Sequence, residues 1–186
     1  EFFTQSLLVV LDELSFSADE DDQQWLTALY QFSETIYNEQ QVFKNPELLT
    51  WLDDLTQAIT ATELVGKANG LNDIIKTVNR ELHSGQAIDF TLPVSSNGVA
   101  QTLLQYQSSH RPDDLWHFVT KDYQKSLLWL QMTSGDNQHT SKVVAWVDHY
   151  LAKHPAPMDI NVRWAGKSYL NIVWQDAMVS GMIDSL

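Results

Sequence analysis

A helix that begins at an Asn-Pro-Glu sequence constrains the fold of this chain more than any other feature. We expect this helix over residues 44–60. Asn45 is a good N-cap, Pro46 fits the first turn, and Glu47 favours the positive end of a helix. The apolar side chains recur at helical spacing and form one stripe, made of Leu48, Leu52, Leu55 and Ile59. The stripe predicts that one face of the helix is buried.

A second amphipathic helix follows closely. It is expected over residues 71–82 and is ended by Gly85, the residue type most often found just past a helix. Its apolar face consists of Leu71, Ile74, Ile75, Val78 and Leu82. Residues 63–70 join the two helices and are predicted to be a short extended link that ends in a glycine turn.

Three segments have strand character. Residues 6–14 and 126–133 are short, apolar and rich in Leu, which is typical of buried strands. Residues 159–166 alternate apolar and polar side chains, as in a strand with one solvated face. The acidic residues 17–24 are expected in an exposed loop, and residues 25–43 fit a strand, a hairpin or a helix equally well.

Further helices are expected in the second half of the chain. Residues 99–107 carry a helical stripe, and Pro112 begins another helix. A helix over 139–154 follows the turn after the second strand, and a last helix begins at 167. Residues 86–98 form a connector that contains Pro93 and Gly98.

The order of these elements predicts an α+β fold. A strand–helix–strand unit precedes a helical block, and a strand–helix–strand–helix unit follows it. This arrangement suits a ferredoxin-like sandwich of two split βαβ units with a central helical insertion. We expect a single domain over 1–186, with a first half at 1–68, the helical insertion at 69–124 and a second half at 125–186.

The last helix has no sequence signal that ends it. Its apolar residues are Val173, Ala177, Met178, Gly181, Met182 and Leu186, and no Asn, Pro or basic last turn follows them. The beginning of the chain likewise enters an apolar run within six residues. We therefore expect residues 1–186 to be a soluble portion of a longer protein.

Composition excludes several classes of function. The net charge of −13 argues against nucleic acid or an anionic lipid surface as the main partner. The absence of cysteine removes disulfides and Cys-ligated zinc. No stretch approaches the roughly 18 apolar residues that a membrane-spanning helix needs. With 44% hydrophobic residues, the chain can still bury a sizeable core.

No motif for catalysis, metal binding or cofactor binding is present in the sequence. The six histidines form no HExxH motif, and neither GxSxG, GxGxxG nor a phosphate-binding loop occurs. The adjacent pairs Asp53–Asp54 and Asp113–Asp114 lie on predicted helices, where neighbouring side chains point about 100° apart. We interpret them as solvated or first-turn acids. No enzyme activity, cofactor or metal is expected.

Four aromatic residues form the remaining candidate site. They lie around the second predicted strand and are Trp116, Phe118, Tyr123 and Trp129. Amphipathic rings of this kind can line a cavity for hydrophobic ligands. The alternative, that these rings fill the core, is favoured by their size.

Several stretches together resemble the RND superfamily of proton-driven exporters, in the MMPL-like branch that exports lipids and other hydrophobic molecules in bacteria. The similarity extends along most of the chain and rests on the order and spacing of loose motifs. These are LLVVLDE, NPELLTWLDDL, ELVGKANGLNDIIKTVNRELHSG, LPVSSNGVAQTLLQY, SLLWLQMT, INVRWAGKSYL and GMIDSL. The acidic spacer of residues 15–43 is longer than this pattern predicts.

The resemblance implies a periplasmic porter domain of an inner-membrane exporter, with somewhat better agreement with the second extracytoplasmic loop than with the first. The domain would form part of the passage for a hydrophobic or lipid-like substrate, with Trp116, Phe118, Tyr123 and Trp129 facing that passage. Its partners would be the sister loop and the membrane helices of the same chain, with a homo-oligomer or an accessory protein as further partners, and no nucleic acid. The proton-coupling acids would lie in membrane helices. The alternative is an extracytoplasmic ligand-binding or sensor domain of a membrane receptor.

Overall fold

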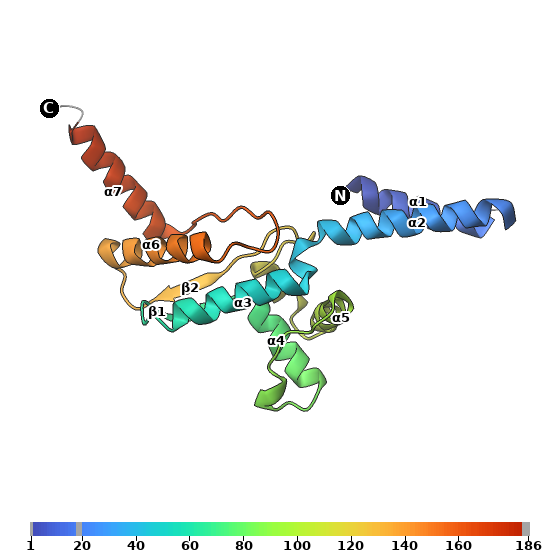
Figure 1. Ribbon diagram of the computed structural model, residues 1–186, viewed down its shortest axis with the longest axis horizontal. Helices are drawn as coiled ribbons and strands as arrows, with labels where there is room; N and C mark the ends of the chain where they lie inside the picture. Colours follow the sequence, from blue (N-terminus) through green and yellow to red (C-terminus); the bar gives the residue numbers. More distant parts are fainter. Residues whose placement is uncertain (1, 18–19, 184–186) are drawn as a thin grey trace. The chain divides into compact units, whose positions relative to one another are not determined.

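The computed structural model describes residues 2–17 and 20–183 (Figure 1). The chain is mostly helical and contains a small antiparallel sheet, so the prediction of a mixed α and β fold is confirmed. Two compact units are formed, each from two separate stretches of chain. Unit 1 comprises residues 1–46 and 93–127, and unit 2 comprises residues 47–92 and 128–186.

Unit 1 contains two long helices, a shorter helix and two 3-10 helices. Their bounds are α1 Phe2–Ser17, α2 Glu20–Gln40, η1 Val42–Lys44, α5 Ser96–Gln107 and η3 Pro112–His117. Outside α1, its buried apolar side chains come from all parts of the unit: Leu26, Val99, Leu103, Leu115, Val119 and Tyr123.

The strand predicted over residues 6–14 is wrong, because this segment lies within α1. A short apolar run fits a strand and a helix equally well, and only its neighbours decide between them. Here α1 packs against α2, so Leu11 is buried while Val9 and Val10 remain exposed. Residues 25–43, whose sequence fits a strand, a hairpin or a helix equally well, are helical as far as Gln40. Residues 20–24, which belong to the predicted exposed loop, are also part of α2. Residues 18–19 lie outside the described residues.

The helix predicted over 99–107 is confirmed as α5. Ser95 caps it, since its hydroxyl accepts a hydrogen bond from the Gly98 N–H at 3.1 Å. The helix predicted from Pro112 is the shorter 3-10 helix η3. Beyond it, Val119 and Ser126 form an isolated antiparallel bridge.

Unit 2 contains the sheet and four α-helices. Its elements are α3 Pro46–Thr60, β1 Val65–Asn69, α4 Leu71–Leu82, η2 Ala87–Asp89, β2 Trp129–Met132, α6 Asn137–Lys153 and α7 Lys167–Ile183. The predicted helices at 44–60, 71–82, 139–154 and from 167 are therefore confirmed. The link at 63–70 is extended as predicted and supplies β1.

Helix α4 ends as its sequence predicts. Gly85 has a φ of +72°, and its N–H donates to the Arg80 carbonyl at 2.9 Å. Of the predicted apolar face, Leu71 and Ile75 are fully buried, whereas Leu82 is exposed at the last turn.

The sheet consists of β1 and β2, which pair antiparallel with Val65 opposite Met132 and Asn69 opposite Trp129. The strand predicted over 126–133 is thus confirmed in its central part. The strand predicted over 159–166 is wrong, because this segment pairs with neither strand. The apolar residues that alternate in this segment do not share one buried face. Trp164 packs against the core of unit 2, while Val162 is half exposed. The ferredoxin-like plan is not confirmed by the residues described.

The core of unit 2 joins α3, β1 and α6. Its buried residues are Ile59, Val65, Ala68, Val143 and Val147. Half-buried side chains of β2, α6 and the following segment pack against them, among them Leu130, Met132, Trp146 and Trp164. Asp136 starts α6, since its side chain accepts a hydrogen bond from the His139 N–H at 2.7 Å.

Helix α7 packs on α6, and Asn137 of α6 donates a hydrogen bond to Gln175 of α7 at 2.6 Å. Large apolar side chains of α7 nevertheless stay exposed, including Leu170, Trp174 and Met178. Among residues 2–17 and 20–183, no helix combines the length and the apolar character needed to cross a membrane.

Candidate functional site

A buried ion pair between two helices of unit 2 forms the centre of the candidate site. Asp53 lies on α3, next to Leu52 of the apolar stripe, and Lys76 lies on α4, next to the fully buried Ile75. The Lys76 and Asp53 side chains are only 8% and 12% exposed.

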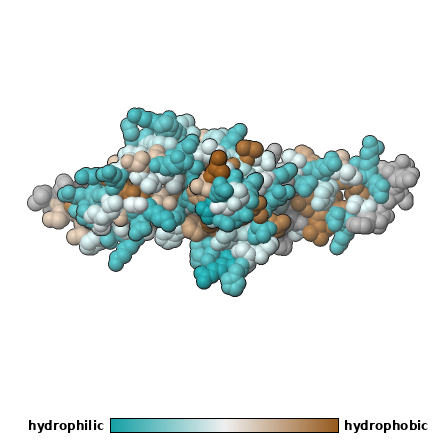
Figure 2. Space-filling model, turned by 90° about the horizontal axis from the view of Figure 1, so that it is seen from below, coloured by the Kyte–Doolittle hydropathy of each residue, from teal (hydrophilic) through white to brown (hydrophobic). Residues whose placement is uncertain are grey.

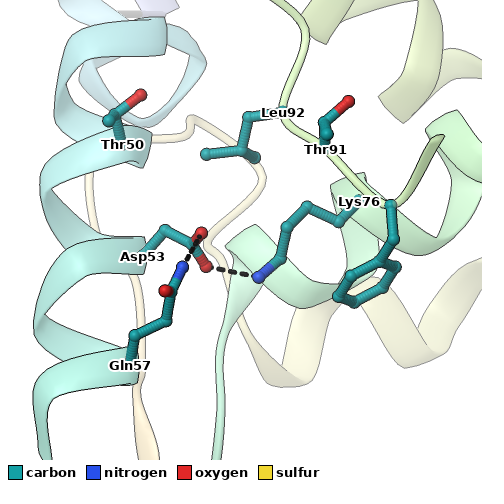
Figure 3. A pocket seen from close by; sticks show the side chains of 7 residues that line it. Thr50, Asp53, Gln57, Lys76, Thr91 and Leu92 are labelled. Carbon is teal, nitrogen blue, oxygen red and sulfur yellow. Dashed lines mark hydrogen bonds and ion pairs between the residues drawn. The ribbon is translucent and has the colours of Figure 1, made fainter. Parts of the chain in front are cut away.

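Three side chains donate hydrogen bonds to the Asp53 carboxylate, and Figure 3 shows two of them, Lys76 and Gln57. The Lys76 ammonium and the Asn72 amide both donate to Oδ1, the amide at 2.7 Å. The Gln57 amide, one turn further along α3, donates to Oδ2 at 2.8 Å. Lys76 also lies 3.3 Å from an oxygen of Asp73. The buried charges are therefore paired and hydrogen-bonded, as burial in a low dielectric requires.

The turn between β1 and α4 is fitted closely to this cluster. Asp73 accepts a hydrogen bond from the Gly70 N–H at 3.1 Å and so closes the start of α4. A Cβ atom at Gly70 would lie 2.5 Å from Oδ1 of the fully buried Asn72. This position needs glycine because a side chain there would displace the amide that holds Asp53.

An aromatic ring covers one side of the ion pair. The Lys76 ammonium lies 4.8 Å from the centre of the Phe90 ring, and the Arg80 guanidinium lies 5.7 Å from it. The connector that carries this ring is held by Asn79, whose amide donates to the Thr91 carbonyl at 3.0 Å.

These residues line a surface pocket of about 540 Å³ (Figure 3). Its lining consists of Thr50, Asp53, Gln57, Lys76, Phe90, Thr91 and Leu92. Hydroxyl, amide and charged groups meet an aromatic and an aliphatic side chain here, so the pocket can receive a molecule with a polar and an apolar part. Within the described residues, no three His, Asp or Glu side chains come together as metal ligands.

The structure places the four predicted site residues in different units. Trp116, Phe118 and Tyr123 lie in unit 1, and the rings of Trp116 and Tyr123 meet edge to face with centres 6.1 Å apart. Trp129 lies in unit 2, on β2, and is 55% exposed. Two of the four rings therefore contact each other, and the role of all four in a substrate passage stays a prediction.

Tyr123 is the buried member of that pair. Only 4% of it is exposed, and its hydroxyl accepts a hydrogen bond from the Gln107 amide at 2.7 Å. Its φ of +55° is unusual for a bulky residue, and its N–H donates to the Thr120 carbonyl at 2.8 Å within the 120–125 turn. The Lys44 ammonium lies 4.3 Å from the ring centre. Burial raises the pKa of Tyr123 and lowers the pKa of Lys44, because it disfavours the charged form of each.

Sequence reasoning missed the pocket in unit 2. The interpretation of Asp53 as a solvated or first-turn acid is wrong, since it is buried in an ion pair, while its neighbour Asp54 is exposed. A signal was present on α4, where Asn72, Lys76 and Asn79 recur at helical spacing beside the apolar face. Such a line of polar residues along a buried edge indicates a polar cluster in the interior.

Comparison of the chain with protein-family models, with curated proteins and with solved structures found no match.

Proposed function

We propose that this chain is the periplasmic porter domain of a proton-driven RND-superfamily exporter, in the branch that moves hydrophobic or lipid-like substrates. The observation that carries the proposal is the pairing of β1 with β2. These strands belong to two stretches that resemble the family, VGKAN and WLQM, and they lie far apart in the sequence. The pairing, with helices before and after each strand, supports the order of elements that the resemblance implies.

In the proposal, the two-stranded sheet of unit 2 belongs to a ferredoxin-like porter sandwich. Its neighbours have suitable positions, since α3 and α6 both contribute to the core next to β1.

Helix α7 supports the membrane part of the proposal. Leu170, Trp174 and Met178 follow one another at a spacing of four residues and are all exposed. Exposed apolar side chains in a row on one face indicate contact with another apolar surface. In the proposal, α7 leads from the porter domain towards the membrane helices of the exporter.

The lining of the pocket next to Asp53 and Lys76 is consistent with a substrate that has both a polar and an apolar part. Gln57 and Thr91 offer polar contacts, whereas Phe90 and Leu92 offer apolar ones. A lipid-like molecule has a polar group and a hydrocarbon part, so both sides of the lining would be used. We propose that this pocket, in addition to the predicted aromatic residues, is part of the substrate passage.

The first test is to read the gene on both sides of the codons for residues 1–186. The proposal expects a span of about 20 apolar residues shortly after Leu186 and several more beyond it. A stop codon directly after Leu186, or a single span followed by a signalling domain, would refute the exporter proposal.

The second test is export by the intact gene product. A strain lacking the gene would be complemented with wild type, Asp53→Ala and Asp54→Ala, and the cellular content of a hydrophobic dye would be measured. Asp53→Ala should raise dye retention relative to wild type, while Asp54→Ala serves as the matched control because Asp54 is exposed. Immunoblots would establish that all three proteins are present in equal amounts. Equal retention in all three strains would remove the pocket from the substrate passage.

A second candidate function is a ligand-binding or sensor domain of a membrane receptor. The observation that favours it is the same pocket, because a charged and aromatic lining within one unit can bind a small amphipathic ligand without any transport. The gene distinguishes the two functions, since a receptor has one or two membrane spans and a signalling domain.

A further inference from the structure

The hairpin formed by α1 and α2 has a charge pattern unlike that of the remaining chain. Nine of the 24 acidic residues fall within residues 1–43, and this stretch contains no Lys, Arg or His. In the described part of the hairpin, Asp12, Glu13, Asp22 and Glu34 are exposed. The hairpin therefore carries a negative field that no basic side chain of its own offsets.

An apolar stripe runs along α2 within this acidic hairpin. Trp25, Leu29 and Phe32 are separated by four and three residues, so they lie on one face of the helix. They are 53%, 37% and 63% exposed. Figure 2 shows hydrophobic atoms at the surface of the hairpin, at the right of the view, bordered by hydrophilic ones.

The stripe is not the face that α2 uses within unit 1. Leu26 and Ser33 are buried, and their positions lie about 100° around the helix from Trp25 and Phe32. The Trp25 ring is held in place, since its N–H donates to the Asp22 carboxylate at 3.0 Å. The stripe is thus a second, outward face with a fixed aromatic ring and an acidic residue beside it.

We propose that this face, consisting of Trp25, Leu29 and Phe32 on α2, docks a basic amphipathic helix of a partner protein. Side chains at positions i, i+4 and i+7 are the usual anchors when two helices pack through apolar faces. Lys or Arg residues at the edge of the partner helix would meet Asp22, which lies beside the stripe, within the negative field of the hairpin. This charge complementarity steers the encounter and selects the partner.

The same charges argue against other occupants. A second copy of the chain would bring an equally acidic hairpin, and like charges across an interface are unfavourable. An anionic lipid surface or a nucleic acid would likewise be repelled. A helix with an apolar stripe and a basic rim is the partner that satisfies both features of the surface. The inference does not depend on the proposed export function.

The test uses synthetic peptides with the whole chain. A labelled amphipathic peptide of Leu and Lys, about 18 residues or five helical turns long, is titrated with the protein and followed by fluorescence anisotropy. A scrambled peptide of the same composition lacks the apolar face, and a Leu–Glu peptide has the opposite charge. We expect binding of the amphipathic basic peptide only, weaker at about 0.15 M salt than at low salt.

Two variants separate the apolar and the charged contributions. Phe32→Ser should weaken binding of the basic peptide by about tenfold or more, whereas Leu104→Ser, at an exposed position of α5, should leave binding unchanged. The double variant Asp12→Lys, Glu13→Lys should weaken binding and reduce its salt dependence. Far-UV circular dichroism would establish that the variants keep their helices.

Several outcomes would overturn the proposal. If the scrambled peptide binds as tightly as the amphipathic one, or if Phe32→Ser binds the basic peptide as tightly as wild type, the binding is unspecific charge attraction and the proposal is wrong. Sedimentation that shows a dimer abolished by Phe32→Ser would assign the face to a second copy. Binding to anionic vesicles that depends on Phe32 would assign it to a lipid surface.

Discussion

Replacing Lys76 by Met is the most direct test of the structure of unit 2. The substitution keeps an unbranched side chain of similar length and removes the ammonium that pairs with Asp53. It leaves a carboxylate in the interior that, among the described residues, keeps the amides of Asn72 and Gln57 as its hydrogen-bond donors. The buried charge then lacks its opposite charge, which is the situation that costs most stability in a protein interior.

The expected magnitude follows from the contacts. Removing one partner of a buried ion pair costs about 3–5 kcal/mol. The two amides remain as donors, and a hydrogen bond to a charged group contributes about 1.5–3 kcal/mol, so the carboxylate is partly compensated. The lost contact of the ammonium with the Phe90 ring adds about 0.5–1 kcal/mol. We therefore expect the free energy of unfolding to fall by about 3 kcal/mol, the lower end of the range.

Urea unfolding followed by far-UV circular dichroism measures this change. With a slope of about 2 kcal/mol per M urea, the midpoint should fall by about 1.5 M. Lys67→Met on β1 is the matched control, since this lysine is exposed and the substitution should change stability by about 0.5 kcal/mol at most. Asp53→Asn should cost less than Lys76→Met, because Lys76 keeps Asp73 as a charged neighbour at 3.3 Å.

The double variant Asp53→Asn, Lys76→Met distinguishes a coupled pair from two independent residues. Neutralising both partners should cost clearly less than the sum of the single changes, by roughly 1–3 kcal/mol. If Lys76→Met unfolds at the midpoint of the Lys67→Met control, or if the two single changes add, the ion pair does not stabilise this unit and the reasoning is refuted.

Three further predictions concern single positions. Tyr123→Phe should lower the free energy of unfolding by about 1 kcal/mol, because the Gln107 amide loses its acceptor; an unchanged thermal midpoint would contradict the hydrogen bond. Hydrogen bonds from the Ser134 hydroxyl and the His139 N–H lower the pKa of Asp136 below its ordinary value of 3.8. The ionised Asp136 therefore stabilises the folded protein above pH 3.8, and this stabilisation is lost as the pH falls through the lowered pKa of the folded state. Asp136→Asn keeps the cap and should therefore reduce the difference in thermal midpoint between pH 7 and pH 2; a midpoint with the wild-type pH dependence would be evidence against this role. Gly70→Ala should cost about 1–3 kcal/mol in urea unfolding through the clash with the buried amide, and wild-type stability would show that the turn can adjust.

The helices of unit 2 could be predicted because several local signals agree in each of them. For α3, the Asn45–Pro46 start and the apolar stripe both indicate the same segment, and for α4 the stripe agrees with the glycine at its end. In α1, by contrast, the apolar run at residues 7–11 has no cap or alternation of its own, and its state depends on packing against α2. Local sequence does not contain that information.

The candidate site could be predicted only in part, for a similar reason. Trp116 and Tyr123 are close in sequence, and their rings also contact each other. Asp53 and Lys76 are 23 residues apart, and no local pattern states that their helices face each other. The polar residues of α4 indicated a buried polar edge, but the partner across that edge depends on the tertiary fold.

Because each unit is made of two separate stretches, neither unit can be completed by one continuous part of the growing chain. The chain passes between the units after residues 46, 92 and 127, so each unit begins before the other is complete. When β1 emerges from the ribosome, β2 has not been made, and β1 stays an unpaired edge until the whole second stretch of unit 1 has followed. At about 5–20 residues per second, this interval lasts for several seconds. Unit 1 is the first whose sequence is complete, and a chain that stops after residue 127 would carry that unit together with an open strand that can pair with other chains.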